Sequence, residues 1–282
     1  MTVLVFGKTG QVARELAHYS DVRCLDRAEA DLSKPAQCGR IIRRLKPAAV
    51  INAAAYTDVD GAEQDEVLAT VINGDAPAAM ALACAQMGVP FVQISTDYVF
   101  DGAGSTGFAP DHKTCPLGAY GRSKRMGERG VVAAGGTYAI LRTAWVFSRH
   151  GTNFLKTMLR LSETREQLSI VNDQIGGPTP AAAIAKACHA MAGGLASGSG
   201  RVGIYHFSGT PEVSWADFAA EIFAQSGRQV TTTGIPSQEY PTPAKRPLNS
   251  RLNCDSLQEQ FGIQRPDWRA GLDQLCADIE VI

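Results

Sequence analysis

Residues 3–17 read VLVFGKTGQVARELA, a short apolar run followed by a glycine-rich turn and a stretch with helical spacing. Gly7, Gly10 and Ala13 form a G-x-x-G-x-x-A pattern between a predicted strand (2–6) and a predicted helix (11–19). A dinucleotide needs a tight turn there, close backbone approach to its pyrophosphate, and free N–H groups at the helix start. A plain turn is the alternative, but the position of the pattern at the head of a strand–helix series favours a dinucleotide site.

That series continues along the chain as short apolar runs separated by helical stretches. The runs lack period-two alternation, which is typical of parallel strands buried on both faces. The sequence therefore predicts an α/β fold, a Rossmann-type doubly wound parallel sheet. The predicted strands are 2–6, 22–25, 49–54, 90–95, 138–143 and 203–208, and the helices are 11–19, 35–45, 63–87 (broken near Asp75), 118–134 and 180–192.

Past residue 150 the rhythm changes, and a smaller, mostly C-terminal substrate lobe is expected. We predict a dinucleotide-binding domain over 1–148, with about 176–208 returning to it, and the lobe over 149–175 and 209–282. A helix-like run, NFLKTMLRL (153–161), opens the lobe, and two more helices are expected near 214–226 and 268–279. The segment GGLASGSGRVG (193–203) is interpreted as a mobile surface connection, and 235–247 as a proline-rich loop.

Composition narrows the functional class. The 282 residues carry a net charge of −1, with 20% charged and 45% hydrophobic residues, so neither nucleic acid nor an anionic membrane surface is expected as a partner. We find no apolar run that approaches the roughly 20 residues of a membrane span. Seven dispersed cysteines without a C-x-x-C pair suggest reduced thiols and a cytoplasmic location, and no metal site is recognised.

The end of the second strand bears on cofactor choice. Asp26 can accept hydrogen bonds from an adenosine ribose, which favours NAD. Lys8 and Arg27 are placed to pair with a 2′-phosphate, which favours NADP, although both can equally be solvated surface charges. NADPH and NADH therefore both remain candidates.

Hydroxyl and carboxyl groups gather where the fourth strand ends, in QISTDYVFDG (93–102), and GAYGRSKR (118–125) follows. Tyr120 and Lys124 are four residues apart, so they share one helix face. A phenol with a pKa near ~10 is a weak acid at neutral pH, and a nearby ammonium is expected to lower that value. Tyr120 would then give a proton to a carbonyl oxygen while hydride reaches the carbon, with Thr96 hydrogen-bonded to the same oxygen. In isolation, such spacing is more often an ordinary exposed helix face.

The chain resembles the extended short-chain dehydrogenase/reductases, and within them the dTDP-4-dehydrorhamnose reductases. The matching stretches cover nearly the whole chain: FGKTGQVA, INAAAYTDVD, STDYVFDG, AYGRSK, LRTAWVF, NFLKTMLRL, NDQIGGPT and YPTPAKRPLNSRLN. The motifs STDYVFDG and Y-G-x-S-K mark a broad class of sugar-nucleotide enzymes, whereas N-D-Q-x-G-x-P-T and R-P-x-N-S-x-L are narrower. The resemblance implies NAD(P)H-dependent reduction of the C4 ketone of a dTDP-4-keto-6-deoxysugar.

The resemblance also implies individual roles. Thr96, Tyr120 and Lys124 match the catalytic residues. The implied cofactor contacts are Gly10, Gln11 and Val12 at the phosphates, Asp26 at the ribose, Asp31 and Leu32 at the adenine, and Ala55, Tyr56, Thr57 and Ile94 along the cofactor. Asp97 and Trp145 match substrate contacts, and a tryptophan face suits the C–H surface of a deoxysugar. Asn153 and Arg246 are candidates for the diphosphate and base.

Several features depart from the family pattern or stay open. Tyr56, Ala13 and Ile175 stand where relatives carry a histidine, often a glycine, and frequently an aromatic residue. Some relatives need Mg²⁺ and dimerise through acidic residues, one of which Glu15 could match; a homodimer is possible and Mg²⁺ is not assigned. The alternatives are a related epimerase or 4,6-dehydratase, and a non-catalytic subunit resembling the regulatory subunit of methionine adenosyltransferase. A dehydratase would need a glutamate beside Asp97, which this chain lacks.

Overall fold

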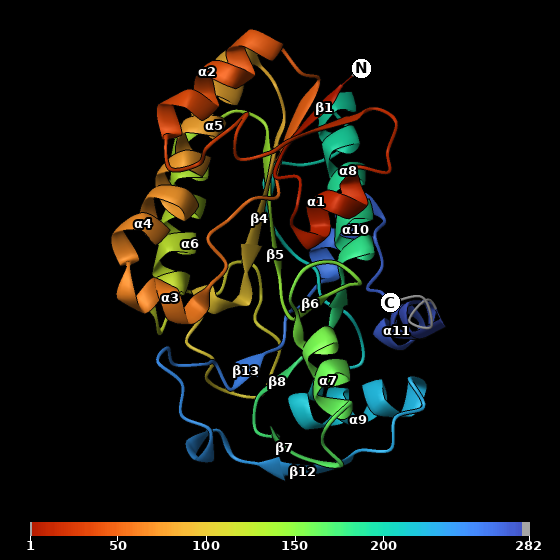
Figure 1. Ribbon diagram of the computed structural model, residues 1–282. Helices are drawn as coiled ribbons and strands as arrows, with labels where there is room; N and C mark the ends of the chain where they lie inside the picture. Colours follow the sequence, from red (N-terminus) through yellow and green to blue (C-terminus); the bar gives the residue numbers. More distant parts are fainter. Residues whose placement is uncertain (1, 278–282) are drawn as a thin grey trace.

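A computed structural model describes residues 2–277, and its centre is a six-stranded parallel sheet (Figure 1). The strand order is β2-β1-β3-β4-β5-β10, with every neighbouring pair parallel. This arrangement confirms the predicted doubly wound fold, and all six predicted strands are present. Their bounds are β1 (Val3–Phe6), β2 (Val22–Leu25), β3 (Ala49–Asn52), β4 (Phe91–Thr96), β5 (Tyr138–Thr143) and β10 (Gly203–His206).

Helices cover both faces of this sheet because each strand buries side chains in both directions. On β1, Val3 and Val5 belong to one core, whereas Leu4 and Phe6 belong to the other. The first core lies under α1 (Gln11–Leu16), α8 (Ala181–Ser197) and α10 (Asp255–Phe261), and the second under α2 (Pro35–Leu45), α5 (Ala76–Met87) and α6 (Ala119–Ala134) (Figure 1). The absence of alternation in the sequence is thus explained by burial on both sides.

The stretch predicted as one broken helix, 63–87, is a series of shorter pieces. It comprises α3 (Val59–Gln64), α4 (Glu66–Thr70), a π-helix η1 (Val71–Asp75) and α5. The π-helix ends at Asp75, where the break was predicted, and it turns Asn73 inward so that its amide hydrogen-bonds Tyr56 and Ser123. Such bulges are frequent at functional sites.

In the described part of the chain, one helical stretch is long and apolar enough to cross a membrane by length and composition alone, contrary to the expectation from the sequence. It runs from Glu66 to Met87; its most apolar 18-residue window has a mean hydropathy of 1.4, and half of that window is buried in the protein. Its α4, η1 and α5 segments pack on α2 and α6, which is how a core helix passes the same test.

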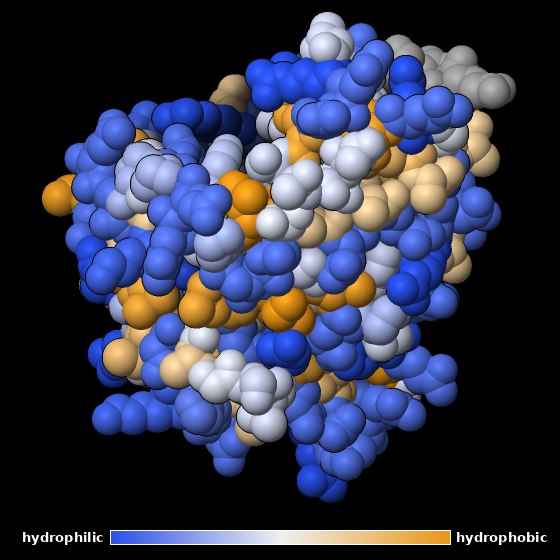
Figure 2. Space-filling model, turned by 90° about the horizontal axis from the view of Figure 1, so that it is seen from below, coloured by the Kyte–Doolittle hydropathy of each residue, from blue (hydrophilic) through white to orange (hydrophobic). Residues whose placement is uncertain are grey.

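The remaining elements form small sheets and helices at one end of the molecule, around a separate core that includes Phe147, Phe218 and Trp268. Seen from this end, the surface is mostly hydrophilic with narrow hydrophobic patches (Figure 2). The small sheets are β6 (Val146–Phe147) with β9 (Thr179–Pro180), β7 (Gln167–Val171) with β12 (Thr231–Ile235), and β11 (Val213–Ser214), β8 (Ile175–Gly176) and β13 (Asn249–Ser250). The other elements are the 3-10 helices η2 (Asp97–Val99) and η3 (Ser237–Glu239), and α7 (Phe154–Ser162), α9 (Trp215–Gln225) and α11 (Trp268–Ala277).

Two local expectations need comment. The mobile connection predicted over 193–203 is wrong at its start, since α8 continues to Ser197 with Leu195 buried against the sheet and Phe261 packed beside Gly194. The helix predicted over 268–279 is found as α11 to Ala277, and its last two positions lie outside the described residues. The domain boundaries themselves stay a prediction.

Candidate active site

The site lies where the direction of sheet building reverses. From β1 the chain passes to β2 on one side and then returns to β3 on the other, so a crevice opens beyond the carboxyl ends of β1 and β3. Ligands of open α/β sheets bind at such a point. Two adjoining cavities, of about 620 and 540 Å³, meet here and share lining residues Thr9, Gly10, Ala53, Ala54, Ala55 and Thr57.

The first cavity is built on the glycine turn. Gly7 has φ +110°, and a Cβ there would lie 3.2 Å from the Ala53 carbonyl carbon, so the turn can approach the chain after β3 only as glycine. Gly10 precedes α1, whose first turn has no side-chain cap, and Ala13 is fully buried on the inner face of that helix. The close backbone approach required at a pyrophosphate is therefore present, and the residues fit a dinucleotide.

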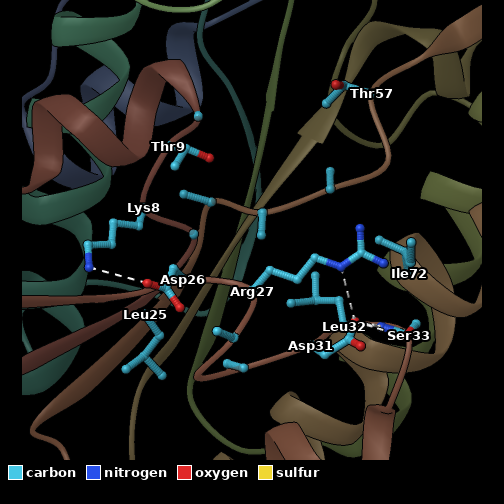
Figure 3. Close-up of a pocket in the computed structure, with 17 residues that line it drawn as sticks. Lys8, Thr9, Leu25, Asp26, Arg27, Asp31, Leu32, Ser33, Thr57 and Ile72 are labelled. Atoms are coloured by element: carbon cyan, nitrogen blue, oxygen red, sulfur yellow. Dashed lines mark hydrogen bonds and ion pairs between the residues drawn. The ribbon is translucent and has the colours of Figure 1, made fainter.

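Charged side chains surround the far end of this cavity (Figure 3). Lys8 forms an ion pair with Asp26 at 3.3 Å, and Arg27 lies across the cavity toward Asp31 at 3.7 Å. A backbone hydrogen bond from Glu29 and the contact with Lys8 hold the pKa of Asp26 below its usual value. This end thus presents a carboxylate that can accept from ribose hydroxyls, and two cations that can meet a phosphate.

The second cavity brings together the residues expected to do chemistry. Thr96 ends β4, Asp97 begins η2, and Tyr120 and Lys124 come from the first two turns of α6; all four line the cavity. The Thr96 hydroxyl lies within hydrogen-bonding reach of the Tyr120 phenol. The helix face shared by Tyr120 and Lys124 therefore turns inward, toward the strand end, and is not an exposed surface.

The electrostatics differ from the expectation that Lys124 lowers the pKa of Tyr120. Burial raises the pKa of Tyr120 above its usual value, and the charge of Asp97 adds to the rise. Lys124 is 4% exposed and donates from Nζ to the Ile94 carbonyl at 2.7 Å. Burial lowers the pKa of Lys124 to about 8, against the opposing charge of Glu128. Desolvation therefore dominates the pKa of the phenol, and Tyr120 keeps its proton at neutral pH.

Asp97 is the most enclosed carboxyl of the site, with 3% exposure. Its Oδ1 accepts from Thr96 Oγ1 at 3.0 Å, and the Ser250 hydroxyl of β13 also faces the carboxyl. Burial raises the pKa of Asp97 to about 6, although these hydrogen bonds oppose the rise. Ser250 lies in the narrow R-P-x-N-S-x-L motif but was not assigned a role from the sequence.

A buried ion pair that was not predicted from the sequence joins α6 to β5. Glu128 and Arg142 pair through two hydrogen bonds of 2.8 Å, and Ser95 donates to Glu128 at 2.6 Å. Arg142 and burial together lower the pKa of His206 to about 3, with burial the larger cause, so this histidine is neutral. Glu128 stands four residues beyond Lys124, so the spacing 120, 124, 128 was the signal that could have revealed it.

Trp145 forms one wall of the second cavity in an unusual backbone conformation. Its φ is +51°, a region that non-glycine residues rarely adopt. The indole stacks on Trp215 with ring centroids 3.5 Å apart and covers Gly176, where a Cβ would lie 2.7 Å from its ring. The pairing of β8 with its neighbours therefore fixes the position of this wall.

The two remaining lobe candidates are both tied to the sheet domain. Asn153 lines the second cavity, caps α7 by accepting from Lys156 N, and donates to Gln11 at 3.0 Å. Arg246 pairs with Asp60 of α3 at 2.7 Å and is absent from the lining of both cavities. Roles for both in binding diphosphate or base stay predictions.

The other candidates fall into clear groups. Among the predicted cofactor residues, only Tyr56 lines neither cavity; it packs against the small cluster of Ala62, Ala69 and Ala119. Glu15 faces His150 at 3.3 Å. Within residues 2–277 there is no group of three or more His, Cys, Asp or Glu side chains that could hold a metal ion. The predicted residues that line the cavities are Gly7, Asp26, Asp31 and Leu32 in the first, Gly10, Ala55 and Thr57 in both, and Gln11, Val12, Ile94, Thr96, Asp97, Tyr120, Lys124, Trp145 and Asn153 in the second.

Comparison with known proteins gives a consistent result. The family model described as RmlD substrate binding domain matches residues 1–281. The dTDP-4-dehydrorhamnose reductase of Burkholderia thailandensis is 44% identical, over 99% of both chains. Among solved structures, the dTDP-4-dehydrorhamnose reductase of Clostridium acetobutylicum is 34% identical over 100% of both chains, with a TM-score of 0.92. That of Bacillus anthracis, in complex with NADP, is 33% identical over 99% of this chain and 100% of that chain, also with a TM-score of 0.92.

Proposed function

The chain belongs to the RmlD substrate binding domain family, and from that membership we propose that it reduces the C4 ketone of dTDP-4-dehydro-L-rhamnose to dTDP-L-rhamnose. The observation that carries the proposal is the meeting of Thr96, Tyr120 and Lys124 in a cavity that continues into the glycine-turn cavity. The phenol that donates the proton and the site for the dinucleotide therefore lie in one crevice, as a carbonyl reduction requires. The product belongs to nucleotide-sugar and surface-polysaccharide biosynthesis.

The cofactor is NADPH or NADH, which supplies hydride to the ketone carbon when bound. In our proposal Gly7, Gly10, Gln11 and Val12 hold the pyrophosphate, Asp26 the ribose, Asp31 and Leu32 the adenine, and Ala55, Tyr56, Thr57 and Ile94 the length of the cofactor. Lys8 and Arg27 lie near the ribose position. They can pair with the negative charge of a 2′-phosphate and so compensate its desolvation. This supports use of NADPH, while Asp26 supports NADH.

The chain's own residues supply the proton and orient the ketone. Tyr120 donates its phenolic proton to the ketone oxygen, and Thr96 holds that oxygen by a hydrogen bond. Lys124 stabilises the phenolate and orients the nicotinamide ribose. Bound cofactor and substrate displace water from around Tyr120. The electrostatic interaction between the Lys124 ammonium and the phenolate then becomes stronger.

The second lobe binds the sugar nucleotide. We place the deoxysugar against Trp145 and beside Asp97, because the indole is apolar and fixed by Trp215. Asn153 and Arg246 are assigned to the diphosphate and base, with the lobe made of 149–175 and 209–282. We further propose a cytoplasmic location, consistent with the free thiols of all seven cysteines, and no partner beyond the substrate other than a possible second copy.

The test follows NADPH and NADH oxidation with enzymatically prepared dTDP-4-dehydro-L-rhamnose. We expect turnover by the wild-type protein, and Tyr120→Phe should lose about 10²–10⁴-fold of it, the usual contribution of a general acid. Cofactor binding by Tyr120→Phe, measured by calorimetry, should stay close to that of the wild-type protein, since the phenol contacts only the reacting end.

Two results would contradict the proposal in different ways. Near-normal turnover by Tyr120→Phe would show that Tyr120 is not the proton donor, while the proposed reduction would still stand. No wild-type turnover with either cofactor, while dinucleotide still binds, would favour another keto-sugar or the non-catalytic subunit. Tightly bound NAD in the purified protein would favour an epimerase.

A further inference from the structure

One oxygen of the Asp97 side chain accepts no hydrogen bond of good geometry from residues 2–277, although the side chain is almost fully buried and the Ser250 hydroxyl lies near the carboxyl. That oxygen is Oδ2, whereas Oδ1 accepts from Thr96 Oγ1 at 3.0 Å. An unpaired buried carboxylate oxygen is costly, but a protonated carboxyl becomes a donor and needs fewer donors around it. A protonated Asp97, enclosed beside Thr96 and Tyr120, can therefore donate its proton to a neighbouring group of the site.

Counting protons shows that the state of Asp97 sets the direction of the Thr96 hydroxyl. Thr96 has one proton, which an ionised Asp97 accepts, and Thr96 Oγ1 itself accepts from the Tyr98 amide at 3.2 Å. A hydrogen bond from the Thr96 hydroxyl lowers the pKa of the Tyr120 phenol, so Thr96 can also donate to the phenolate. A Thr96 proton held by an ionised Asp97 is available neither to the ketone nor to the Tyr120 phenolate.

We propose that protonated Asp97 is a positioning residue, which donates to Thr96 so that the Thr96 proton turns toward the ketone oxygen, and which replaces through Thr96 the proton that Tyr120 gives up. This inference rests on the proposed reduction and adds to it the source of the second proton. It also gives the S-T-D order of the strand end a chemical reason, because Thr96 is the link between Asp97 and Tyr120.

The proton steps balance. The Tyr120 O–H bond breaks as the new O–H bond of the product alcohol forms. The Thr96 proton then passes to the Tyr120 phenolate, and the Asp97 O–H proton passes to Thr96. One carboxylate is left at Asp97, and it takes a proton from solvent after the product leaves.

The surroundings of Asp97 keep this proton near neutral pH. Burial raises the pKa of Asp97 to about 6, and a sugar nucleotide above it would remove more water and raise the value further. The titratable groups around it are Tyr98 on its own turn, Tyr120 and Lys124 on α6, and Arg246 with Asp60 beyond Tyr98. The ammonium of Lys124, which lines the same cavity, is directed to the Ile94 carbonyl and opposed by the charge of Glu128.

The test is the pH dependence of kcat and KM for the wild-type protein and three variants. In the wild-type protein kcat should fall as pH rises through the pKa of Asp97. Asp97→Asn, whose amide can still donate to Thr96 but has no proton to transfer, should lose about 10²-fold or more in kcat and show no such fall. Ser250→Ala removes a donor that stabilises the carboxylate, so the fall should move to higher pH. Asp101→Asn, a matched change that lines neither cavity, should keep the wild-type profile.

Each other result contradicts the inference. An Asp97→Asn profile like that of the wild type, or a loss confined to KM, would make Asp97 a substrate contact only. If Asp97→Asn does not fold, as judged by its thermal transition, an unshifted profile in Ser250→Ala contradicts the relay equally. Wild-type turnover separates these results from failure of the proposed reduction, since an inactive wild-type protein would contradict both together.

Discussion

At the scale of single residues, burial decides the chemistry of the site more than sequence neighbours do. Tyr120 and Lys124 are neighbours on one helix face, yet burial moves the pKa of the phenol up and that of the ammonium down to about 8. Each shift favours the neutral form. A neutral phenol is the proton donor that a ketone reduction needs, whereas the lysine must keep its charge.

The lysine therefore predicts an alkaline limb in the pH profile. Beyond the fall that follows Asp97, turnover should fall a second time as pH rises above about 8, because the Lys124 ammonium is lost there. Lys124→Arg, whose guanidinium stays charged, should retain part of the activity without that fall, and Lys124→Met should lose about 10²-fold at neutral pH. Steady-state rates between pH 6 and 10 test this, and an alkaline fall that persists at the same pH in Lys124→Arg would contradict it.

At the scale of elements, glycines fix how closely α6 approaches the rest of the site. A Cβ at Gly127 would meet the backbone oxygen of Asn73 in the π-helix, and one at Gly121 would meet that of Tyr98. The chain after β4, the π-helix and the catalytic helix are thus packed backbone to backbone. The π-helix supplies the surface against which α6 presents Tyr120 and Lys124.

This packing predicts opposite effects for the same substitution in two helices. Gly127→Ala should destabilise the protein by about 1–3 kcal/mol, because α6 must move away from Asn73. Gly193→Ala in α8 should stabilise it by about 0.5–1 kcal/mol, because a Cβ there meets nothing within 4 Å. Urea unfolding followed by circular dichroism measures both; equal changes in the two variants would show that this packing is not what distinguishes them.

At the scale of the whole molecule, Asp60 ties the loop over residues 242–248 to the sheet domain. Asp60 of α3 accepts from the Ala244 amide at 3.0 Å and from Arg246 at 2.7 Å. Both partners are partly exposed, so the pair should add at most about 1 kcal/mol to global stability. Its main effect should be local, on the loop that leads to β13 and Ser250.

Asp60→Ala should therefore speed amide hydrogen exchange over residues 242–248 and change the free energy of unfolding by less than about 1 kcal/mol. Mass-resolved exchange and urea unfolding measure the two quantities. Asp58→Ala on the same segment, which loses only the cap of α3 at Gly61, is the control and should leave exchange at 242–248 unchanged. Unaltered exchange in Asp60→Ala would show that the loop is held by other contacts.

The extent of prediction from sequence follows from the range of the interactions involved. The sheet strands and the glycine turn could be found because each signal lies within a few consecutive residues, as in 3–17. Tyr120, Lys124 and Thr96 could be paired because two strand-end and helix-start segments meet at the same sheet edge. By contrast, the contact of Ser250 with Asp97 joins distant segments, and two-residue strands such as β13 are too short for a hydrophobic period.

The burial of the site was likewise beyond the sequence. The expected lowering of the Tyr120 pKa considered only the cation four residues away, and the desolvation that reverses it depends on the complete cavity wall. Asn153 shows the same point, since the amide assigned to a ligand is already hydrogen-bonded to Gln11 and caps α7. The local sequence pattern identified the side chains of the site, but not the burial and the hydrogen bonds that also act on them.

The stacked pair Trp145 and Trp215 has an optical consequence. At 3.5 Å between ring centroids, the indole transitions of the two residues couple, so the protein should show an exciton couplet in its circular dichroism spectrum. Because Trp145 lines the second cavity and its partner does not, a sugar nucleotide that shifts only Trp145 would change the amplitude of that couplet. The wall of the pocket thus carries its own spectroscopic reporter of occupancy, without an added label.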